Sequence, residues 1–206
     1  MQVNSPEYWD FKWKEYQIMY AEQGKRRIDL PGFDMILSKI KEGDRVLDFG
    51  CGLGEFLTHV AHAMPTVKLY GCDISQEACL TVLNKDFDVA WYEDITIFTD
   101  YFDVITVIHS LEHFIDPVQC IKDLKKALKP NGWLIVILPY HDWYWIEHYR
   151  VWGKTEIEEC FAHFDCNINT VIRNPTVLLD NGKIMPKIYP NGDLFEEAIC
   201  FIQFNS

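Results

Sequence analysis

The feature that most constrains this chain is a glycine turn between an apolar strand and a helix, at residues 45–54 (RVLDFGCGLG). Gly50, Gly52 and Gly54 allow the backbone to take positive φ angles and to come close to a ligand. The helix that follows directs free N–H groups toward whatever lies over the turn. Such a turn is typical of a parallel α/β sheet that holds a nucleoside-type cofactor at its carboxyl edge.

The composition is that of a globular protein with one domain. A length of 206 residues suits a single domain over residues 1–206, and a hydrophobic fraction of 49% is too high for a disordered chain. No apolar run approaches the roughly 18 residues of a membrane span. Residues 1–6 lack a signal-peptide pattern, so we expect a cytoplasmic protein.

The net charge indicates which class of partner is disfavoured, and the cysteines indicate their own redox state. A formal charge of −12 repels phosphate backbones, which disfavours a nucleic acid as partner. The seven cysteines are odd in number and contain no Cys-x-x-Cys pair. We therefore expect reduced thiols buried in the core.

Strand and helix signals alternate five times along the first two thirds of the chain. Apolar or β-branched runs predict strands at residues 46–49, 67–72, 89–92, 102–108 and 133–138. Helices are expected at residues 6–22 and 33–40, before Pro65, after a Ser75 cap, and after an Asp116 cap followed by Pro117. Residues 129–132 (KPNG) read as a turn into the last of these strands. This alternation predicts a doubly wound, mainly parallel sheet with helices on both faces.

The pattern changes after Pro139. Thr155 and Glu158 read as a capping box for a helix, and strands are expected at residues 167–173 and 198–204. Turn signals at residues 180–182 and 191–192 predict antiparallel pairing at the far edge of the sheet. We divide the domain into an N-terminal helical cap (1–42), a cofactor-binding core (43–139), an aromatic lid and helix (140–165) and C-terminal antiparallel strands (166–206).

Aromatic side chains gather in two segments outside the expected core. We expect them to cover the cofactor and shape an acceptor pocket, with core packing as the alternative for about half of them. They are Tyr140, Trp143, Tyr144, Trp145, Tyr149 and Trp152 in the lid, and Tyr8, Trp9, Phe11 and Trp13 near the N-terminus.

The motifs of residues 40–140, taken together, resemble the class I S-adenosylmethionine-dependent methyltransferases. Residues 46–54 are similar to that family's first motif, and Asp73 follows Asp48 by 25 residues, as the family's ribose-binding acid does. Residues 93–95 (EDI) resemble the segment that meets the adenine. Residues 102–105, 111–117 (LEHFIDP) and 128–132 resemble the subgroup of quinone-biosynthesis and other small-molecule methyltransferases. The resemblance implies a seven-stranded Rossmann-like sheet, S-adenosyl-L-methionine as cofactor and S-adenosyl-L-homocysteine as product.

The same resemblance assigns cofactor contacts to specific positions. Asp73 is expected to accept two hydrogen bonds from the ribose hydroxyls, Asp48 to orient the ammonium group, and Asp94 (alternatively Glu93) to meet the adenine. The full set is Asp48, Gly50, Cys51, Gly52, Gly54, Asp73, Ile74, Asp94, Ile95, Ile108 and His109. NAD is the rival cofactor, but dinucleotide folds usually place the glycine loop near the chain start, and more than 40 residues precede it here.

The expected chemistry is in-line methyl transfer to a small molecule, for which the protein aligns the acceptor and removes a proton. His113 is the first candidate for general base because an imidazole titrates near neutral pH. Glu112 is the second candidate, although the pair could instead cap and orient its loop, and His141 is a third. Oxygen is the expected acceptor atom, with nitrogen and carbon left open. A non-catalytic binding module or partner subunit is the other functional class.

A metal site is the last alternative. The small-RNA 2′-O-methyltransferases carry Glu-x-x-Glu-His and a later His as metal ligands. The matching residues here are His109, Glu112 and His113, with His148 as a later ligand. Because His109 stands where that family has Glu, and because the charge argues against RNA, we expect no metal.

Overall fold

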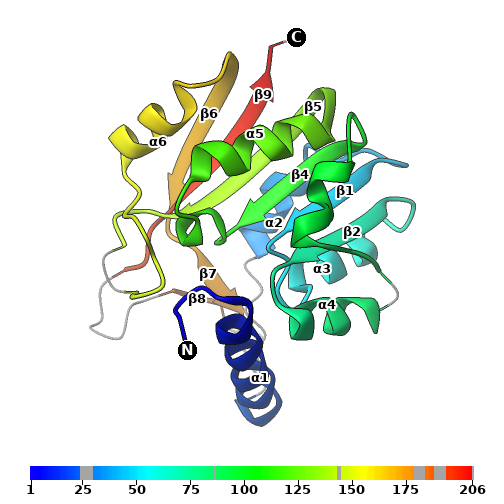
Figure 1. Cartoon of the computed structure of the whole chain (residues 1–206), viewed down its shortest axis with the longest axis vertical. Coiled ribbons are helices and arrows are strands. Elements are labelled where there is room, and N and C mark those ends of the chain that lie inside the picture. The colour runs from blue at the N-terminus through cyan, green and yellow to red at the C-terminus, as the bar shows by residue number, and fades with distance from the viewer. Residues whose placement is uncertain (24–29, 86, 143–144, 179–183, 188–193, 206) are drawn as a thin grey trace.

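The computed structural model describes residues 1–23, 30–85, 87–142, 145–178, 184–187 and 194–205. In this part of the chain seven strands form one mixed sheet, in the order β3-β2-β1-β4-β5-β9-β6 (Figure 1). The strands are β1 (Arg45–Phe49), β2 (Lys68–Asp73), β3 (Asp88–Trp91), β4 (Phe102–Ile108), β5 (Leu128–Pro139), β6 (Cys166–Arg173) and β9 (Glu197–Phe204). Strands β1 to β5 pair in parallel, whereas β9 is antiparallel to both β5 and β6. The mixed α/β sheet with antiparallel strands at its far edge is confirmed.

The chain leaves the centre of the sheet in two directions, which creates a switch point between β1 and β4. Strands β2 and β3 lie on one side of β1, and the chain then returns to place β4 on the other side. The loops after β1 and β4 therefore leave neighbouring strands at the same carboxyl edge. In open α/β sheets this is where ligands bind.

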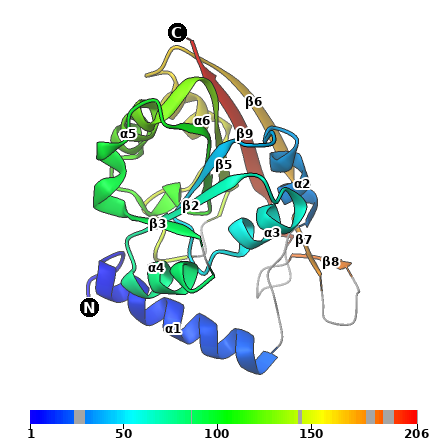
Figure 2. The same ribbon diagram turned by 90° about the vertical axis from the view of Figure 1, so that its right-hand side faces the viewer.

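Helices cover both faces of the sheet, as predicted (Figure 2). Alternate strand residues face opposite sides: Leu47 and Phe49 pack in one buried cluster with α5 and α6, and Val46 packs in another with α2 and α3. The helices are α1 (Pro6–Gln23), α2 (Leu30–Leu37), α3 (Glu55–Ala63), α4 (Gln76–Leu83), α5 (Pro117–Ala127) and α6 (Lys154–Phe161), with short 3-10 helices η1 (Tyr92–Ile97) and η2 (Leu111–His113).

Helix α1 packs along α4 at the carboxyl edge instead of covering a face of the sheet (Figures 1 and 2). Gln17 Nε2 donates to Thr81 Oγ1 at 3.0 Å, and Lys14 Nζ lies 3.3 Å from Glu77 Oε2. None of the described helices is both long and apolar enough to span a lipid bilayer.

Two of the three predicted helix caps are confirmed and one is wrong. Ser75 Oγ accepts from the backbone N–H of Ala78 at 3.2 Å, and Asp116 Oδ1 accepts from that of Gln119 at 2.9 Å. Helix α6 begins at Lys154 after a Gly153 cap, and its cap carboxylate belongs to Glu156, which accepts from the Gly153 N–H at 3.0 Å.

The Thr155–Glu158 capping box fails because a contact outside the helix fixes the position at which the helix starts. Trp152 is fully buried, and its carbonyl accepts from the His141 N–H at 2.7 Å. The chain is therefore anchored immediately before Gly153, and Glu158 pairs instead with Lys154, at 3.7 Å.

The predicted turn before β5 is an irregularity inside the strand. Phe102 pairs with Leu128 and Val104 pairs with Trp133, so residues 129–132 bulge out opposite a single residue of β4. Asn131 takes a φ of 63°, which suits this bulge. Helix α2 also lies three residues earlier than predicted.

The C-terminal part contains a two-stranded ribbon that the sequence pattern did not predict. Strand β7 (Thr176–Leu178) pairs antiparallel with β8 (Ile184–Pro186). The turn signals at residues 180–182 and 191–192 lie outside the described residues. All seven cysteines are free, and all but the half-buried Cys166 are buried, which confirms the expectation of reduced core thiols.

Candidate functional site

The glycine loop (residues 50–54) lies at the carboxyl end of β1. Gly50, Gly52 and Gly54 have φ angles of 78°, 50° and 75°, so all three take the conformation that glycine adopts at least cost. Gly54 caps helix α3. The N–H groups of Gly50 and Cys51 donate to the Cys72 carbonyl at 2.7 and 3.0 Å, which ties the loop to the end of β2.

Asp73 connects the glycine loop to the loop after β2. Its Oδ2 accepts from the Gly52 N–H, and its Oδ1 accepts from the Ser75 N–H, both at 2.9 Å. A carboxylate oxygen can accept more than one hydrogen bond, so each keeps capacity for a ligand hydroxyl. Burial raises the pKa of Asp73 to about 6, although these N–H groups oppose the shift.

Asp48 is a second buried carboxyl beside the loop. Thr106 Oγ1 donates to its Oδ1 at 2.9 Å, while burial raises the pKa of Asp48 to about 7 and the nearby charge of Asp73 adds to the shift. Two acidic groups enclosed next to a glycine loop favour a ligand that carries positive charge.

Helix α1 closes over this loop. A Cβ on Gly52 would lie 2.6 Å from the Trp13 ring, and one on Gly50 would lie 2.2 Å from Ser110 Oγ, so both positions need glycine for space as well as for φ. Asp10 accepts from Ser75 Oγ at 2.6 Å. Of the N-terminal aromatics, Trp13 therefore covers the glycine loop, whereas Phe11 is 50% exposed.

The other residues that the sequence predicts to contact the cofactor differ in how deeply they are buried. Cys51 is buried, Ile74 is 37% exposed and Ile95 is enclosed in the hydrophobic core. Ile108 and His109 end β4 at the switch point, both half-buried, and His109 has a φ of 48°. The side chain of Asp94 lies outside the described part of the structure, so its expected contact with adenine stays a prediction.

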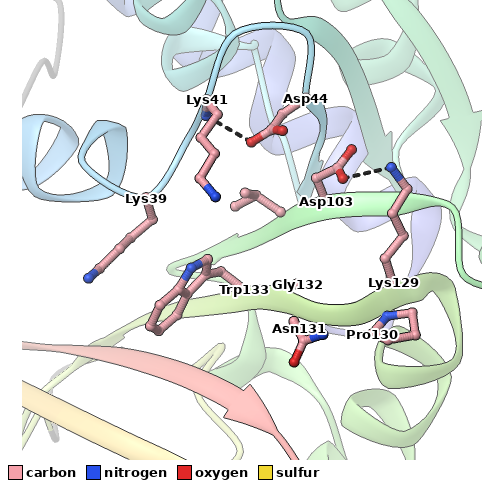
Figure 3. A pocket seen from close by; sticks show the side chains of 10 residues that line it. Lys39, Lys41, Asp44, Asp103, Lys129, Pro130, Asn131, Gly132 and Trp133 are labelled. Carbon is pink, nitrogen blue, oxygen red and sulfur yellow. Dashed lines mark hydrogen bonds and ion pairs between the residues drawn. The ribbon is translucent and has the colours of Figure 1, made fainter. Parts of the chain in front are cut away.

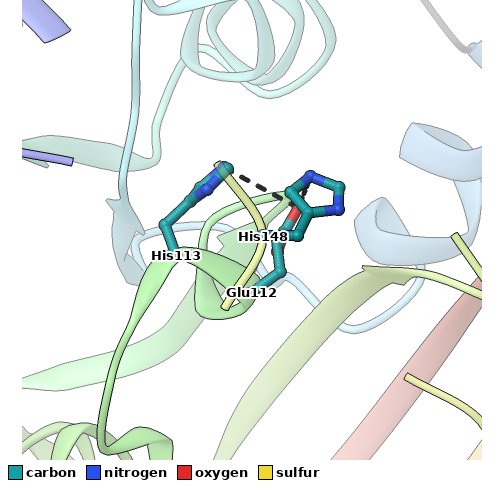
Figure 4. A group of neighbouring side chains, drawn as sticks. All are labelled: Glu112, His113 and His148. Atoms are coloured by element: carbon teal, nitrogen blue, oxygen red, sulfur yellow. Dashed lines mark ion pairs between the residues drawn. The ribbon is translucent and has the colours of Figure 1, made fainter. Parts of the chain in front are cut away.

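Glu112 is the centre of a histidine cluster at the end of β4 (Figure 4). It lies on η2, is 1% exposed, and its Oε1 lies 4.0 Å from the Nε2 atoms of both His113 and His148. We call Glu112, His113 and His148 the Glu112 cluster. His109 Nδ1 approaches the same oxygen at 3.8 Å, while His109 Nε2 lies 3.1 Å from Glu197 Oε2.

Burial dominates the titration of this cluster. It raises the pKa of Glu112 to about 8 and lowers the pKa of His113 to about 4, and it also lowers the pKa of His148. His113 is therefore a neutral imidazole at pH 7, but a base with so low a pKa accepts a proton only weakly. The pKa of Glu197, by contrast, is lowered. Burial alone would raise this pKa, but the hydrogen bond from His109 and the nearby cationic groups together outweigh the effect of burial.

His141, the third catalytic candidate, is separate from the Glu112 cluster within the described residues. Its side chain is exposed, and its ring stacks on Tyr140 with centroids 4.1 Å apart. Its φ of 54° and its N–H bond to the Trp152 carbonyl fix the backbone there. The structure thus brings Glu112 and His113 together and leaves His141 outside their group.

The segment between β5 and α6 supplies residues that the motifs did not mark. Glu147 accepts a short hydrogen bond from the Tyr8 hydroxyl and lies 3.3 Å from Lys12 Nζ, so this segment is tied to α1. Of its aromatic residues, Trp152 belongs to the core, Trp145 and Tyr149 are exposed, and Trp143 and Tyr144 lie outside the described residues. Helical or strand periodicity could not reveal these contacts because they join residues more than 130 positions apart.

A shallow cavity of about 240 Å³ lies at the opposite edge of the sheet (Figure 3). It is formed where β1, β4 and β5 begin, and Lys129 Nζ closes one side through a 2.6 Å contact with Asp103 Oδ1. None of the predicted site residues lines it, and we assign it no role in the chemistry.

The comparisons with known proteins agree with this geometry. A sequence profile described as methyltransferase domain matches residues 20–170. The chain is 37% identical over 102 residues to a ubiquinone biosynthesis O-methyltransferase of Paraburkholderia phymatum, which covers 45% of this chain and 43% of that protein. It spans less than half the length of the first curated relatives it matches.

Two solved structures share the fold at low sequence identity. One is a complex between the Haloferax volcanii Trm112 methyltransferase activator and a methyltransferase, with a TM-score of 0.72, 16% identity, and coverage of 99% of this chain and 98% of that one. The other is an S-adenosylmethionine-dependent methyltransferase from Archaeoglobus fulgidus, with a TM-score of 0.66, 17% identity, and coverage of 91% and 99%. The chain therefore belongs to the methyltransferase domain family, and it shares the fold of S-adenosylmethionine-dependent methyltransferases.

Proposed function

We propose that this chain transfers a methyl group from S-adenosylmethionine to an oxygen of a small molecule. The observation that carries the proposal is the shared edge: the glycine loop with Asp73 and the Glu112 cluster follow the neighbouring strands β1, β2 and β4. A donor held at the first and an acceptor held at the second would face each other across the switch point.

On the donor side, Asp73 would accept from the ribose hydroxyls and Asp48 would face the ammonium group. The raised pKa of each carboxyl in the empty protein supports this assignment, because a cationic or hydrogen-bonding ligand restores the charged form. The glycine loop would follow the methionine part of the cofactor, and Asp94 with Ile95 would meet the adenine. Residues 43–139 are thus the proposed cofactor-binding core.

On the acceptor side, residues 1–42 and 140–165 would close over the substrate, and residues 166–206 would complete the sheet. Trp9 lies 4.8 Å from His113 between ring centroids, in an edge-to-face arrangement. An aromatic ring next to polar groups suits a planar acceptor with a hydroxyl. The name of the Paraburkholderia relative, a ubiquinone biosynthesis O-methyltransferase, supports oxygen as the methylated atom.

A non-catalytic partner subunit is the second candidate. The observation that favours it is the structural likeness to a complex that contains a methyltransferase activator. The enclosed Asp73 and the intact glycine loop argue for a working donor site, and a protein partner would add to that site without replacing it.

Methyl transfer to a panel of small acceptors tests the proposal. The protein is incubated with methyl-labelled S-adenosylmethionine and with phenolic, enolic, amine and sugar acceptors, and the labelled product is identified by mass spectrometry. We expect label on the oxygen of a planar hydroxyl compound and none with Asp73→Asn. Labelling of the amines alone would overturn O-methylation, and no turnover with any acceptor would favour the non-catalytic candidate.

A further inference from the structure

The Glu112 cluster brings three side chains that commonly bind metal ions close together. One oxygen and two nitrogens of Glu112, His113 and His148 lie within 4.8 Å of one another. Ligand atoms around a tetrahedral zinc ion, with bonds of about 2.0–2.1 Å, lie about 3.3 Å apart. The two measured Glu112–histidine distances of 4.0 Å need to shorten by only about 0.7 Å to match this spacing.

The orientation of the imidazoles provides independent support. His113 Nδ1 lies 3.1 Å from the Glu147 carbonyl oxygen, which can only accept, so the proton is on Nδ1 and the Nε2 lone pair faces Glu112. His148 Nε2 also faces Glu112, whereas its Nδ1 lies 3.9 Å from Asp142 Oδ2, which is too far for a hydrogen bond. Histidines that bind metals are commonly backed by a carbonyl or a carboxylate, as His113 is.

One oxygen of the buried Glu112 carboxyl group has no hydrogen-bond partner in the described structure. Glu112 is almost completely enclosed, and its Oε2 has no hydrogen-bond partner among the described residues. Burying a carboxylate without a paired charge or hydrogen bonds costs several kcal/mol, roughly, unless a cation neutralises it. A divalent ion between Glu112 and the two Nε2 atoms would supply that charge.

We propose that Glu112 Oε1, His113 Nε2 and His148 Nε2 bind one divalent ion of the zinc class. Two imidazoles and one carboxylate form the ligand set of several catalytic zinc sites, which keep a further position open. His109 is not part of the set because the ligand atoms that all lie within 4.8 Å of one another belong to Glu112, His113 and His148 alone among the described residues.

The open position would face the acceptor, and this role rests on the proposed methyl transfer. An acceptor hydroxyl bound there loses its proton to water more easily, because the ion lowers its pKa. The oxygen then forms the new bond to the methyl carbon, the carbon–sulfur bond breaks, and its electron pair stays on sulfur. In this scheme the ion, rather than a side chain of the protein, makes the acceptor hydroxyl more acidic.

The test is metal binding by the whole chain. After treatment with a chelator, the protein is titrated calorimetrically with Zn²⁺, and Co²⁺ is used as a visible-absorption probe of coordination. We expect one ion per chain and cobalt bands typical of low coordination number. Glu112→Gln and His148→Asn should each weaken zinc binding by more than about 100-fold, since even changes behind the ligands cost 10–100-fold.

His163→Asn is the matched control because His163 is exposed just after α6 and lies outside the Glu112 cluster. It should bind zinc as the unchanged protein does. Absence of binding by the unchanged protein, or equal loss in His163→Asn and His148→Asn, would overturn the site. S-adenosylhomocysteine binding is measured on every variant to verify folding. If a variant fails that check, the cobalt spectrum of the unchanged protein decides, because six-coordinate or absent bands would contradict the proposal.

The same cofactor measurement separates the two proposals. A protein that binds S-adenosylhomocysteine but no metal contradicts only the metal site. A protein that binds zinc but not the cofactor contradicts only the methyltransferase function.

Discussion

We call the glycine loop with Asp48 and Asp73 the proposed donor half of the carboxyl edge, and the Glu112 cluster with Glu147 the proposed acceptor half. The two halves are assembled from contacts of different sequence range. On the donor side Asp73 bonds Gly52 and Ser75, at most 21 positions away. On the acceptor side Glu112 meets His148, 36 positions later, while Tyr8 bonds Glu147, 139 positions away. A site made from loops that are close in sequence can be predicted from a sequence motif. A site made from segments far apart in sequence can be identified only in the folded structure.

The largest expected effect tests the donor half. Asp73→Ala removes the acceptor for two backbone N–H groups and for the proposed ribose hydroxyls. We expect S-adenosylhomocysteine affinity to fall at least about 100-fold, because hydrogen bonds to charged groups contribute about 1.5–3 kcal/mol each. Calorimetry measures the affinity, and Asp123→Ala, at a half-buried carboxylate of α5 away from the glycine loop, is the control. Unchanged binding in Asp73→Ala would refute the ribose assignment.

The next prediction separates the acceptor half from the donor half. Glu112→Gln keeps the shape of the side chain and removes its charge, so methyl transfer should slow by about 100-fold, the lower range for acid–base or metal assistance. The dissociation constant of S-adenosylhomocysteine should stay within about twofold, because Glu112 belongs to the other half. Comparable losses in the methyl-transfer rate and in the affinity for S-adenosylhomocysteine would contradict the separation of the site into two halves.

The pH dependence of cofactor binding gives a smaller effect. In the empty protein Asp48 and Asp73 have pKa values of about 7 and about 6, with Asp10 and Glu55 as further negative neighbours. Binding to the charged forms releases protons, so affinity should rise about tenfold from pH 6 to pH 8 and then level off.

The control for this pH dependence is Asp48→Asn, which should flatten most of the slope. Titrations in buffers of different ionisation enthalpy count the protons released. Affinity that falls as pH rises over the same range would contradict the assignment of Asp48. The same shifts predict that the empty protein loses stability as pH rises from about 4 to about 7, since its folded state binds more protons than the unfolded chain.

The smallest effect concerns the link between α1 and the segment before α6. Tyr8→Phe removes one hydrogen bond to Glu147, and we expect the free energy of unfolding to fall by about 1 kcal/mol. Urea denaturation measures it, with the exposed Tyr149→Phe as control. Equal stability of the two variants would mean that Lys12 alone holds Glu147 in place.

The fold was largely predictable because its signals are local. The apolar strands, the glycine loop and the caps at Ser75 and Asp116 each depend on residues a few positions apart. The Thr155–Glu158 capping box and the turn at residues 129–132 were wrong because a buried Trp152 and the pairing of β5 with β4 decide the local structure there.

Only one part of the candidate site, the glycine loop with Asp73, could be predicted from the sequence. The family motif predicts Asp73 and the glycine loop, and the structure shows them joined. His141 was the third candidate for general base, yet its side chain is exposed, and its backbone has a positive φ and donates to the Trp152 carbonyl. The pairing of His109 with Glu197 joins β4 to β9, a contact that no sequence spacing predicts.

Parallel calorimetric titration with S-adenosylmethionine, S-adenosylhomocysteine and NAD tests the central claim most directly. The donor half, with Asp73 and Asp48 enclosed beside the glycine loop, predicts one site per chain with micromolar affinity for the first two compounds and no heat from NAD. Binding of NAD, or no binding of either methionine-derived compound, would contradict the account of this edge of the sheet.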